Sequence, residues 1–556
     1  MEEAVRREAS SAVDEIHDVV VLGSGSAALI AALAAHEYGA TDVVVVEKSG
    51  MVGGTSAMSG GMMWIPLNHL AAEAGVRDSF DDVVTYLDHL APGMLEDEPL
   101  SGFLDGGPEM IRFLVDKTPV RLRPFLDFPD YQSEAPGAMK HGGRSLDNDV
   151  FSFETLGSHA TRVNPPKTGI PKRTSRIEDR HGGVTPEMLE DRVRRDCRGQ
   201  GQALIGALYK GIIDRNIPVH FESRARHLIV DAGRVTGVVV EREGGVVRYG
   251  ARRGVIIATG GFEWSSSLVR AFLRGPMTGP ISVPECEGDG LLMAMEVGAS
   301  LGNMAHAWWM TSSLESKAGQ HRDTRANYLA CQSERTAPGS IMVNRFGRRF
   351  VNEAVNYNAL GFALHNFDPV THDYPNLPYW LVFNETFMSK YRMFTSPAGT
   401  PAPSWATKGE TLDELAHASG IDPEGLKATV ERFNAMVRNG HDDDYGRGDT
   451  TYDNFAGDKE LPAPMSTLGV LEGGPYFAIK MEAGVNGTCG GPRANANGQV
   501  LGLDNQPIHG LYVCSNTMAA VTAGVYGGAG GTLGPGGTFG FLAGRHAATA
   551  IGKEPK

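Results

Sequence analysis

The sequence has no excess of positive charge and few cysteines, and both shortages exclude classes of partner and site. Its 556 residues carry 51 Lys and Arg against 66 Asp and Glu, which gives a formal net charge of −15. Because a chain of this charge repels a polyanion, we expect no nucleic-acid partner. The five cysteines lie far apart and form neither a CxxC nor a CxxCH motif. We therefore expect no zinc knuckle, no c-type haem and no disulfide framework.

Signals for export and for membrane insertion are also missing. The first 17 residues, MEEAVRREASSAVDEIH, carry charges throughout and contain no apolar run of the kind found in signal peptides. One long uncharged stretch, 515–544, is too rich in glycine for a membrane span. The sequence thus predicts a cytoplasmic protein. A basic stretch at 162–180 could touch an acidic membrane surface, although a solvated loop is the favoured interpretation.

Glycine, in contrast, is abundant. It accounts for 71 of 556 residues, against a usual share of about 7%, whereas the 31 prolines are an ordinary number. We infer that glycine serves tight turns and close approach of the backbone to a ligand. The chain length fits two to four domains, or one large enzyme with an insertion.

The clearest motif lies near the N-terminus, in DVVVLGSGSAALIAALAAHEYGATDVVVVEK. This segment predicts a strand, a glycine turn, an alanine-rich helix and a second strand that ends at Glu47. The turn matches G-x-G-x-x-A at Gly23, Gly25 and Ala28, in which the glycines permit a tight turn and the approach of a pyrophosphate to the helix N-terminus. Glu47 is suitably placed to accept hydrogen bonds from ribose hydroxyls. The order predicts a dinucleotide site, and the alternative is a flavodoxin-like unit with an accidental glycine pattern.

Three further segments are rich in small residues. EKSGMVGGTSAMSGGMMWIPLN follows the first unit, RGVIIATGGF lies at 253–262, and GLYVCSNTMAAVTAGVYGGAGGTLGPGGTFGFLAGRHAA lies near the C-terminus. The last segment predicts a strand, a glycine loop and a helix of small residues. Bare backbone and short hydroxyl side chains suit a loop that lies along a diphosphate and a flat ring.

In this order, the segments resemble the FAD-binding half of the succinate dehydrogenase/fumarate reductase flavoprotein superfamily. The resemblance covers nearly the whole chain. It implies an α/β fold in which a Rossmann-like FAD-binding domain of the glutathione-reductase type is interrupted by an α+β catalytic domain. The expected divisions are 1–305 for the first part of the FAD-binding domain, 306–480 for the catalytic domain, and 481–556 for the C-terminal part of the FAD-binding domain.

The resemblance also implies FAD as the cofactor. Covalent members of the superfamily attach the flavin through a His in the loop after the acidic residue, but here GGTSAMSGG contains neither His nor Cys, so we expect non-covalent FAD. No metal site is expected. The residues expected to contact FAD are Gly23, Gly25, Ala27, Ala28, Glu47, Lys48, Gly54, Thr55, Ser56, Gly60, Gly61, Ala258, Gly260, Asn516 and Leu533.

Between these segments, TPEMLEDRVRRDCRGQGQALIGALYKGIIDRN predicts a helix, with Thr185 as its N-cap and Pro186 at its first position. The next segment, VHFESRARHLIVDAGRVTGVVVEREGG, predicts a small antiparallel sheet that precedes the strand before ATGG. Trp308, Trp309 and Met310 either line an apolar pocket or pack in the core.

The candidate catalytic residues are tyrosines. In fumarate-reducing members of the superfamily, a catalytic Arg follows the GxRFxNE motif, but here VNRFGRRFVNEAVNYNAL holds Tyr357 at that position. Without this Arg, a dicarboxylate substrate is disfavoured. The tyrosine resembles the 3-ketosteroid Δ1-dehydrogenase branch, as do Tyr526 and Gly530 in VYGGAG and Tyr131 in a D-Y-x-x-E-x-P-G segment.

That resemblance implies a 3-oxosteroid 1-dehydrogenase, which introduces a C1=C2 double bond beside the C3 ketone. The Tyr526 hydroxyl and the Gly530 backbone N–H would stabilise the carbonyl oxygen as it gains enolate character. Tyr357 would take the C2 proton, and Tyr131 would be hydrogen-bonded to it and lower its pKa from a reference value of about 10. The C1 hydride would pass to flavin N5.

Several alternatives share these residues. One is a fumarate-reductase-like flavin enzyme that reduces an activated C=C bond, and others are a Δ4-dehydrogenase of a 5α-3-ketosteroid and a dehydrogenase of a simpler cyclic ketone. A flavin-binding protein without turnover is less favoured, because an inert pocket does not need the tyrosines. The expected partners are a small apolar substrate and an electron acceptor that the sequence does not identify.

Overall fold

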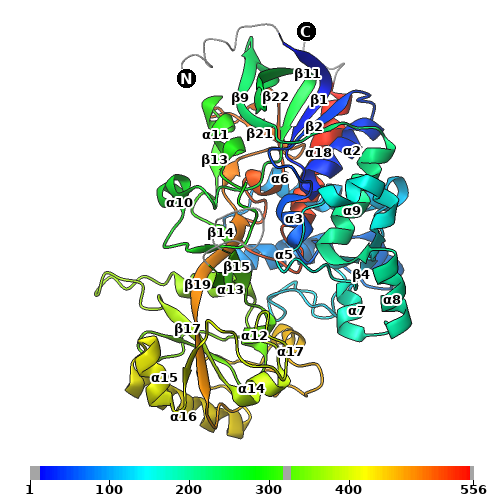
Figure 1. Ribbon diagram of the computed structural model, residues 1–556. Coiled ribbons are helices and arrows are strands. Elements are labelled where there is room, and N and C mark those ends of the chain that lie inside the picture. Colours follow the sequence, from blue (N-terminus) through cyan, green and yellow to red (C-terminus); the bar gives the residue numbers. More distant parts are fainter. Residues whose placement is uncertain (1–12, 317–326, 551–556) are drawn as a thin grey trace.

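The computed structural model of the protein describes residues 13–316 and 327–550. Figure 1 shows two lobes, one that contains the first and last described residues, 13 and 550, and a second that contains α14 (Glu385–Lys390), α15 (Leu412–Ser419), α16 (Pro423–Asn439) and α17 (Thr451–Ala456). The long strand β19 (Tyr476–Thr488) runs from one lobe into the other. None of the described helices is long and apolar enough to cross a bilayer.

The first lobe is built on an eight-stranded sheet. Five neighbouring strands run parallel, and a parallel sheet needs cover on both faces, so its strands are strongly apolar. In order across the sheet they are β8 (Val219–His220), β2 (Val43–Val46), β1 (Glu15–Leu22), β11 (Gly245–Ile257) and β22 (Pro507–Val513). This arrangement confirms the predicted α/β fold with a Rossmann-like core.

Two helices of small residues pack closely beside this sheet, α2 (Ser26–Glu37) and α18 (Leu533–Thr549). A Cβ on Gly540 would lie 2.3 Å from the Ala27 carbonyl oxygen, and one on Gly544 would lie 2.2 Å from the Ala31 carbonyl oxygen. The backbones of the two helices therefore touch, which only glycine permits. The contact brings the N-termini of both helices to the same end of the sheet.

The predicted antiparallel sheet is present. It consists of β9 (Arg224–Asp231), β10 (Arg234–Arg242) and the first half of β11. Strand β21 (Gln499–Leu501) pairs antiparallel with β22 at the other edge of the main sheet.

The helix predicted from Thr185 to Asn216 is wrong as one element, because it is broken in two. Helix α8 (Pro186–Arg194) begins as predicted, and the Thr185 hydroxyl accepts a hydrogen bond from the Met188 N–H at 3.3 Å. The break follows at β7 (Cys197–Arg198), and α9 (Gln200–Asp214) is the second helix. Asp196 (φ 42°) and Gln200 (φ 58°) adopt left-handed conformations that no helix continues through.

The second sheet joins the two lobes through β19. Its strands lie in the order β15-β14-β19-β17-β16, and β12 and β18 also pair with β19. Their bounds are β12 (Gly279–Pro280), β14 (Ala307–Ser316), β15 (Asn327–Ala330), β16 (Ile341–Asn344), β17 (Tyr379–Asn384) and β18 (Thr407–Gly409). The predicted boundaries of the catalytic domain, after residue 305 and after residue 480, remain a proposal.

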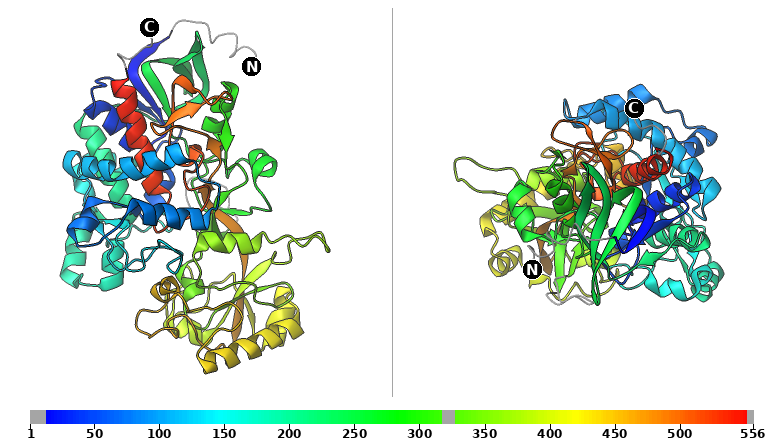
Figure 2. Two further views of the ribbon diagram at one scale, coloured as in Figure 1. Left: turned by 180° about the vertical axis from the view of Figure 1, so that it is seen from behind. Right: turned by 90° about the horizontal axis from the view of Figure 1, so that it is seen from above.

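The remaining elements surround these sheets, and Figure 2 shows α18, in red, from behind. The helices are α3 (Gly54–Met58), α4 (His69–Glu73), α5 (Phe80–Leu90), α6 (Asp97–Lys117), α7 (Arg176–His181), α10 (Ser266–Phe272), α11 (Asp289–Glu296), α12 (Ser333–Thr336), α13 (Tyr357–Leu364), α14 (Glu385–Lys390), α15 (Leu412–Ser419), α16 (Pro423–Asn439) and α17 (Thr451–Ala456). The 3₁₀ helices are η2 (Phe153–Arg162) and η3 (Ser515–Thr517), and the short strands are β3 (Met63–Trp64), β4 (Leu122–Pro124), β5 (Ser145–Asn148), β6 (Phe151–Ser152), β13 (Leu301–Gly302) and β20 (Gly491–Pro492).

Candidate active site

The first glycine turn fits the approach of a dinucleotide. Gly23 has φ 101°, and a Cβ there would lie 2.4 Å from the Ala258 carbonyl oxygen, so the position requires glycine. Gly25 is the N-cap of α2 and provides no side-chain cap for the helix. A Cβ on Gly25 would meet only the Ser56 hydroxyl, at 3.6 Å. An uncapped helix N-terminus with open space before it suits a pyrophosphate.

The predicted flavin loop lies against this turn. The Ser56 hydroxyl, on α3, accepts a hydrogen bond from the Ser26 N–H at 3.3 Å. Thr55 Oγ1 accepts one from the Val283 N–H at 3.2 Å. A Cβ on Gly61 (φ 74°) would lie 2.4 Å from the Gln200 backbone, so this glycine also cannot be replaced without a clash.

The two charged residues after β2 already have partners within the protein. Glu47 accepts hydrogen bonds from the Ser24 hydroxyl at 2.6 Å and from the Ser49 N–H at 2.7 Å, and burial raises its pKa. Its remaining lone pairs suit ribose hydroxyls. Lys48 forms ion pairs with Glu287 at 3.0 Å and Asp289 at 2.9 Å. Lys48 is therefore placed as part of an ion-pair cluster beside the loop.

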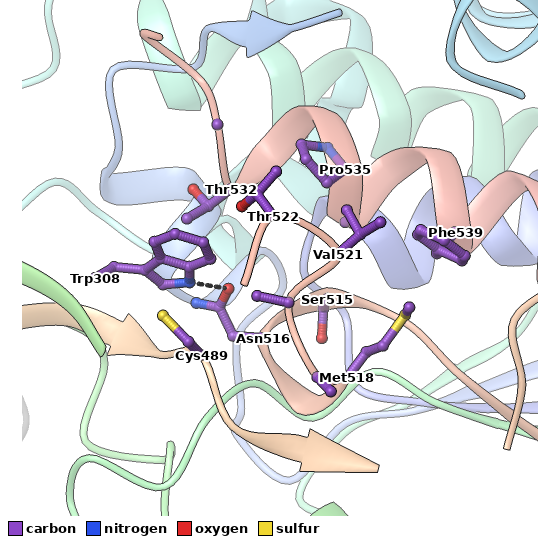
Figure 3. A pocket seen from close by; sticks show the side chains of 14 residues that line it. Trp308, Cys489, Ser515, Asn516, Met518, Val521, Thr522, Thr532, Pro535 and Phe539 are labelled. Carbon is purple, nitrogen blue, oxygen red and sulfur yellow. Dashed lines mark hydrogen bonds between the residues drawn. The ribbon is translucent and has the colours of Figure 1, made fainter. Parts of the chain in front are cut away.

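A pocket at the N-terminus of α18 completes the cradle for a cofactor (Figure 3). Trp308 and Asn516 point toward each other, and the Trp308 indole N–H donates to Asn516 Oδ1 at 3.1 Å. Leu533 begins α18, which has no side-chain cap. The site thus contains two turns that require glycine, two helix N-termini without side-chain caps, and this pocket. These features fit FAD, and the residues that form them would hold it when it is bound.

Three predicted tyrosines meet in one buried cluster. The Tyr131 hydroxyl donates to the Tyr357 oxygen at 3.2 Å, as predicted. The Tyr526 ring stacks on Tyr131 with centroids 5.4 Å apart and meets Tyr357 edge-on at 5.3 Å. All three side chains are at most 8% exposed. Residues from three distant parts of the chain thus form one apolar site with three hydroxyl groups.

The predicted lowering of the Tyr357 pKa by Tyr131 is wrong. Burial raises the pKa of Tyr357 well above its usual value, and the neighbouring Tyr131 and Tyr526 raise it further. The pKa of Tyr526 is also raised by burial, but hydrogen bonds from Thr532 and Tyr357 oppose that rise. Tyr357 thus binds its proton strongly, whereas Tyr526 is the better hydrogen-bond donor.

Gly530 has the conformation and the free N–H that an oxyanion site requires. Its φ is 97°, and a Cβ would lie 2.5 Å from the Met62 carbonyl oxygen. Its carbonyl accepts hydrogen bonds from the Trp64 and Gly534 N–H groups, at 3.1 and 2.8 Å. Its own N–H has no acceptor in the described part of the chain. This N–H is available to a substrate oxygen.

A buried polar network fixes Tyr131 against the loop that carries Tyr526 and Gly530. Asp130 accepts hydrogen bonds from the Trp64 indole at 2.8 Å and from Arg144 at 2.7 Å. The Tyr86 hydroxyl donates to the Gly527 carbonyl at 2.7 Å, and the Tyr131 N–H donates to the same carbonyl at 3.0 Å. These contacts hold two segments of the site in a fixed relative position.

Helix α13 is tied to the same loop through Asn358, a residue that the sequence did not single out. Its side-chain amide donates to the Gly524 carbonyl at 3.1 Å, and its oxygen accepts from the Trp309 N–H at 3.0 Å. Tyr357 is the first residue of this helix, so Asn358 fixes the position of Tyr357.

The sequence also missed a fourth tyrosine. Tyr452, on α17, contacts Tyr131 edge-on with centroids 5.0 Å apart and is 7% exposed. Burial raises its pKa to about 12. No motif surrounds Tyr452, so only the folded structure distinguishes it from the other tyrosines.

The two neighbouring tryptophans differ in their surroundings. Trp308 lines the tyrosine cluster, as expected of a residue in an apolar pocket, whereas Trp309 packs in a separate core, which was the alternative interpretation.

Comparisons with known proteins show the family to which the chain belongs. The FAD binding domain family matches residues 18–533, and the chain belongs to that family. It is 40% identical to 4-oxocyclohexanecarboxylate 2-dehydrogenase of Sinomonas cyclohexanicum over 95% of this chain and 92% of the relative. It is 36% identical to 3-oxosteroid 1-dehydrogenase of Mycobacterium tuberculosis over 97% and 99%.

A solved structure resembles nearly the whole chain. The 3-ketosteroid delta1-dehydrogenase from Sterolibacterium denitrificans, in complex with 1,4-androstadiene-3,17-dione, matches with a TM-score of 0.89 and 32% identity. The match covers 96% of this chain and all of the other. The chain is thus an FAD-dependent oxidoreductase with the fold of the ketosteroid dehydrogenases, and the predicted cofactor and superfamily are confirmed.

Proposed function

We propose that the protein is a 3-oxosteroid 1-dehydrogenase, which introduces a C1=C2 double bond into ring A of a 3-ketosteroid. The observation that carries the proposal is the cluster of Tyr131, Tyr357 and Tyr526 next to the free N–H of Gly530. The relatives at 36% and 32% identity, which act on 3-oxosteroids according to their names, support the same substrate class.

The cluster suits removal of a proton beside a ketone. The Tyr526 hydroxyl and the Gly530 N–H would donate hydrogen bonds to the ketone oxygen, which gains negative charge as the adjacent C–H bond breaks. Tyr357 would first lose its own proton to solvent, and its phenolate would then take the C2 proton, with the Tyr131 hydroxyl 3.2 Å away. Bound FAD supplies the acceptor for the hydride that leaves C1. Neutral phenols also cost less to bury in an apolar pocket than carboxylates.

A second candidate is dehydrogenation of a single-ring ketone. The relative at 40% identity is named for 4-oxocyclohexanecarboxylate, which contains the same ketone and adjacent C–H bonds. Reduction of fumarate is less favoured, because Tyr357 stands where the fumarate-reducing enzymes are expected to carry a catalytic Arg.

Product analysis tests the proposal. The purified holoenzyme is incubated with 4-androstene-3,17-dione and a dye that accepts electrons, and the products are separated by chromatography and weighed by mass spectrometry. We expect a product with two hydrogens fewer and a C1=C2 bond. Unchanged steroid, together with conversion of a single-ring ketone, would favour the second candidate.

We also propose a cytoplasmic location, which cell fractionation tests.

A further inference from the structure

Arg176 stands beside the tyrosine cluster without a partner of opposite charge. It is the first residue of α7 and is half-buried, and over residues 13–316 and 327–550 its guanidinium has neither a hydrogen bond nor an ion pair. Arg173, nearby, pairs with Asp196 at 2.8 Å. A half-buried guanidinium that has lost part of its hydration and gained no partner points to an anionic ligand.

The backbone that carries Arg176 is held on both sides. Ser175 is fully buried and caps α7, since its hydroxyl accepts from the Glu178 N–H at 3.2 Å and the Glu178 carboxylate accepts from the Ser175 N–H at 2.9 Å. The Ile177 N–H donates to Asp147 at 2.8 Å. The stretch at 162–180, expected to be a solvated loop, is therefore anchored here, and the Arg176 side chain extends from a fixed point.

Arg176 lies between the tyrosines and the predicted flavin loop. Its positive charge favours the ionised forms of Tyr131 and Tyr452, and so opposes the rise that burial gives to the pKa of each. Ile177, the next residue, packs into the tyrosine cluster. A Cβ on Gly60 would lie 3.8 Å from Arg176 Nε. The guanidinium is thus placed where a substrate bound between flavin and tyrosines would meet it.

No carboxylate within residues 13–316 and 327–550 forms an ion pair with Arg176. Asp147 is near enough for Arg176 to lower its pKa against the rise caused by burial, without such a pair. The Asp147 oxygens instead accept hydrogen bonds from the Ile177 N–H and, at 2.9 Å, from the Asn148 N–H. Asp147 therefore holds the backbone in place and leaves the guanidinium open.

We propose that Arg176 binds a carboxylate of the substrate, so that the preferred substrates are ring ketones that carry an acid group. This inference rests on the proposed function, in which Tyr526 and Gly530 hold the ketone oxygen. Attachment at the ketone and at the acid would fix the ring in one orientation, and a bidentate guanidinium–carboxylate pair suits this second attachment. The acid group could belong to a single-ring keto acid or to a steroid acid, and the experiment separates the two.

The experiment compares substrates with and without the acid group. Initial rates of dye reduction are measured with 4-oxocyclohexanecarboxylate and with the uncharged 4-methylcyclohexanone, using wild type, Arg176→Gln and Arg176→Lys. For Arg176→Gln we expect kcat/KM to fall about 10–100-fold for the keto acid, as for the loss of a charged hydrogen-bonded pair, and to stay within about two-fold for the neutral ketone. Arg176→Lys should lie between, because it keeps the charge but loses the planar fork.

Two controls separate charge and flavin effects from ligand binding. Arg195→Gln removes one positive charge from a side chain that is 53% exposed and outside the site, and it should leave both substrates unchanged. The visible spectrum reports flavin content. Two results would overturn the assignment and place Arg176 on the cofactor. One is an equal loss of kcat/KM for both ketones in Arg176→Gln, and the other is a loss of bound flavin from that variant.

Binding without turnover keeps the test independent of the reaction. Cyclohexanecarboxylate, which has no ketone, should bind wild-type holoenzyme in calorimetry and compete with 4-methylcyclohexanone, and Arg176→Gln should abolish both effects. Absence of binding to wild type would overturn the inference even if the variants fail to fold. A parallel comparison of 4-androstene-3,17-dione with its C17-carboxylic acid shows which ring system carries the acid. If no ring ketone is oxidised but the acid still binds, the proposed function fails and the anion site stands.

Discussion

Replacement of Tyr526 by Phe tests the oxyanion site at a single atom. The substitution removes the hydroxyl, which lies 3.3 Å from Thr532 Oγ1 and also interacts with Tyr357, and it leaves the ring contacts with Trp308 at 5.2 Å and Tyr131 at 5.4 Å. A hydrogen bond between neutral groups contributes about 0.5–1.5 kcal/mol to stability, so the variant should fold and bind FAD.

The effect on the reaction should be much larger than the effect on stability. Loss of one of two oxyanion donors in a water-poor site lowers turnover by about 10²–10³-fold. The assay is anaerobic stopped-flow measurement of flavin bleaching by a saturating ring ketone, which reports the chemical step alone. Substrate affinity should change less, since the ring is held mainly by apolar contacts. A bleaching rate within a few-fold of wild type would refute the oxyanion assignment.

Three further predictions concern the base, the oxyanion glycine and the cofactor. Tyr357→Phe should lower the bleaching rate by about 10²–10⁴-fold. Because burial raises the pKa of Tyr357, the wild-type rate should rise with pH through the alkaline range, whereas the rate of the variant should not change with pH. A rate that rises with pH in the variant would exclude Tyr357 as the base. Gly530→Ala should lower the free energy of unfolding, measured by urea titration, by about 1–3 kcal/mol and should abolish activity. The control is Gly39→Ala, at a similar φ of 105° but with nothing within 4 Å of its Cβ, and it should lower the free energy of unfolding by less. Equal losses of stability would contradict the clash with Met62. Acid precipitation should leave the flavin in the supernatant, because the flavin is expected to be bound non-covalently. Burial raises the pKa of the nearby Cys286 thiol and so keeps it from forming a bond to the flavin. Yellow protein in the pellet would show a covalent bond.

The sequence was sufficient for the parts of the fold that local patterns encode. The strand, glycine turn and helix around Gly23 and Gly25 are present as predicted, because turn chemistry and apolar runs act over short distances. The break between α8 and α9 was not predictable, since Asp196 and Gln200 are ordinary residues that tertiary contacts hold in left-handed conformations.

The candidate site divides in the same way. Tyr131, Tyr357 and Tyr526 lie within motifs and could be identified before the fold was known. Tyr452 and Arg176 lie in no motif, and only the folded positions of α17 and α7 bring them beside the cluster. The pKa of Tyr357 could not be inferred either, because its direction depends on burial of the whole cluster rather than on one hydrogen bond.

If the tyrosine cluster and bound FAD dehydrogenate a ring ketone, such a ketone should bleach the flavin in the absence of oxygen, and a panel of compounds measures this bleaching. The panel contains 4-androstene-3,17-dione, 4-oxocyclohexanecarboxylate, 4-methylcyclohexanone and, with the flavin reduced beforehand, fumarate. We expect at least one ring ketone to bleach the flavin stoichiometrically, with a matching yield of the unsaturated product, and fumarate to leave reduced flavin unchanged. Rapid reoxidation by fumarate, with no bleaching by any ring ketone, would contradict this reaction.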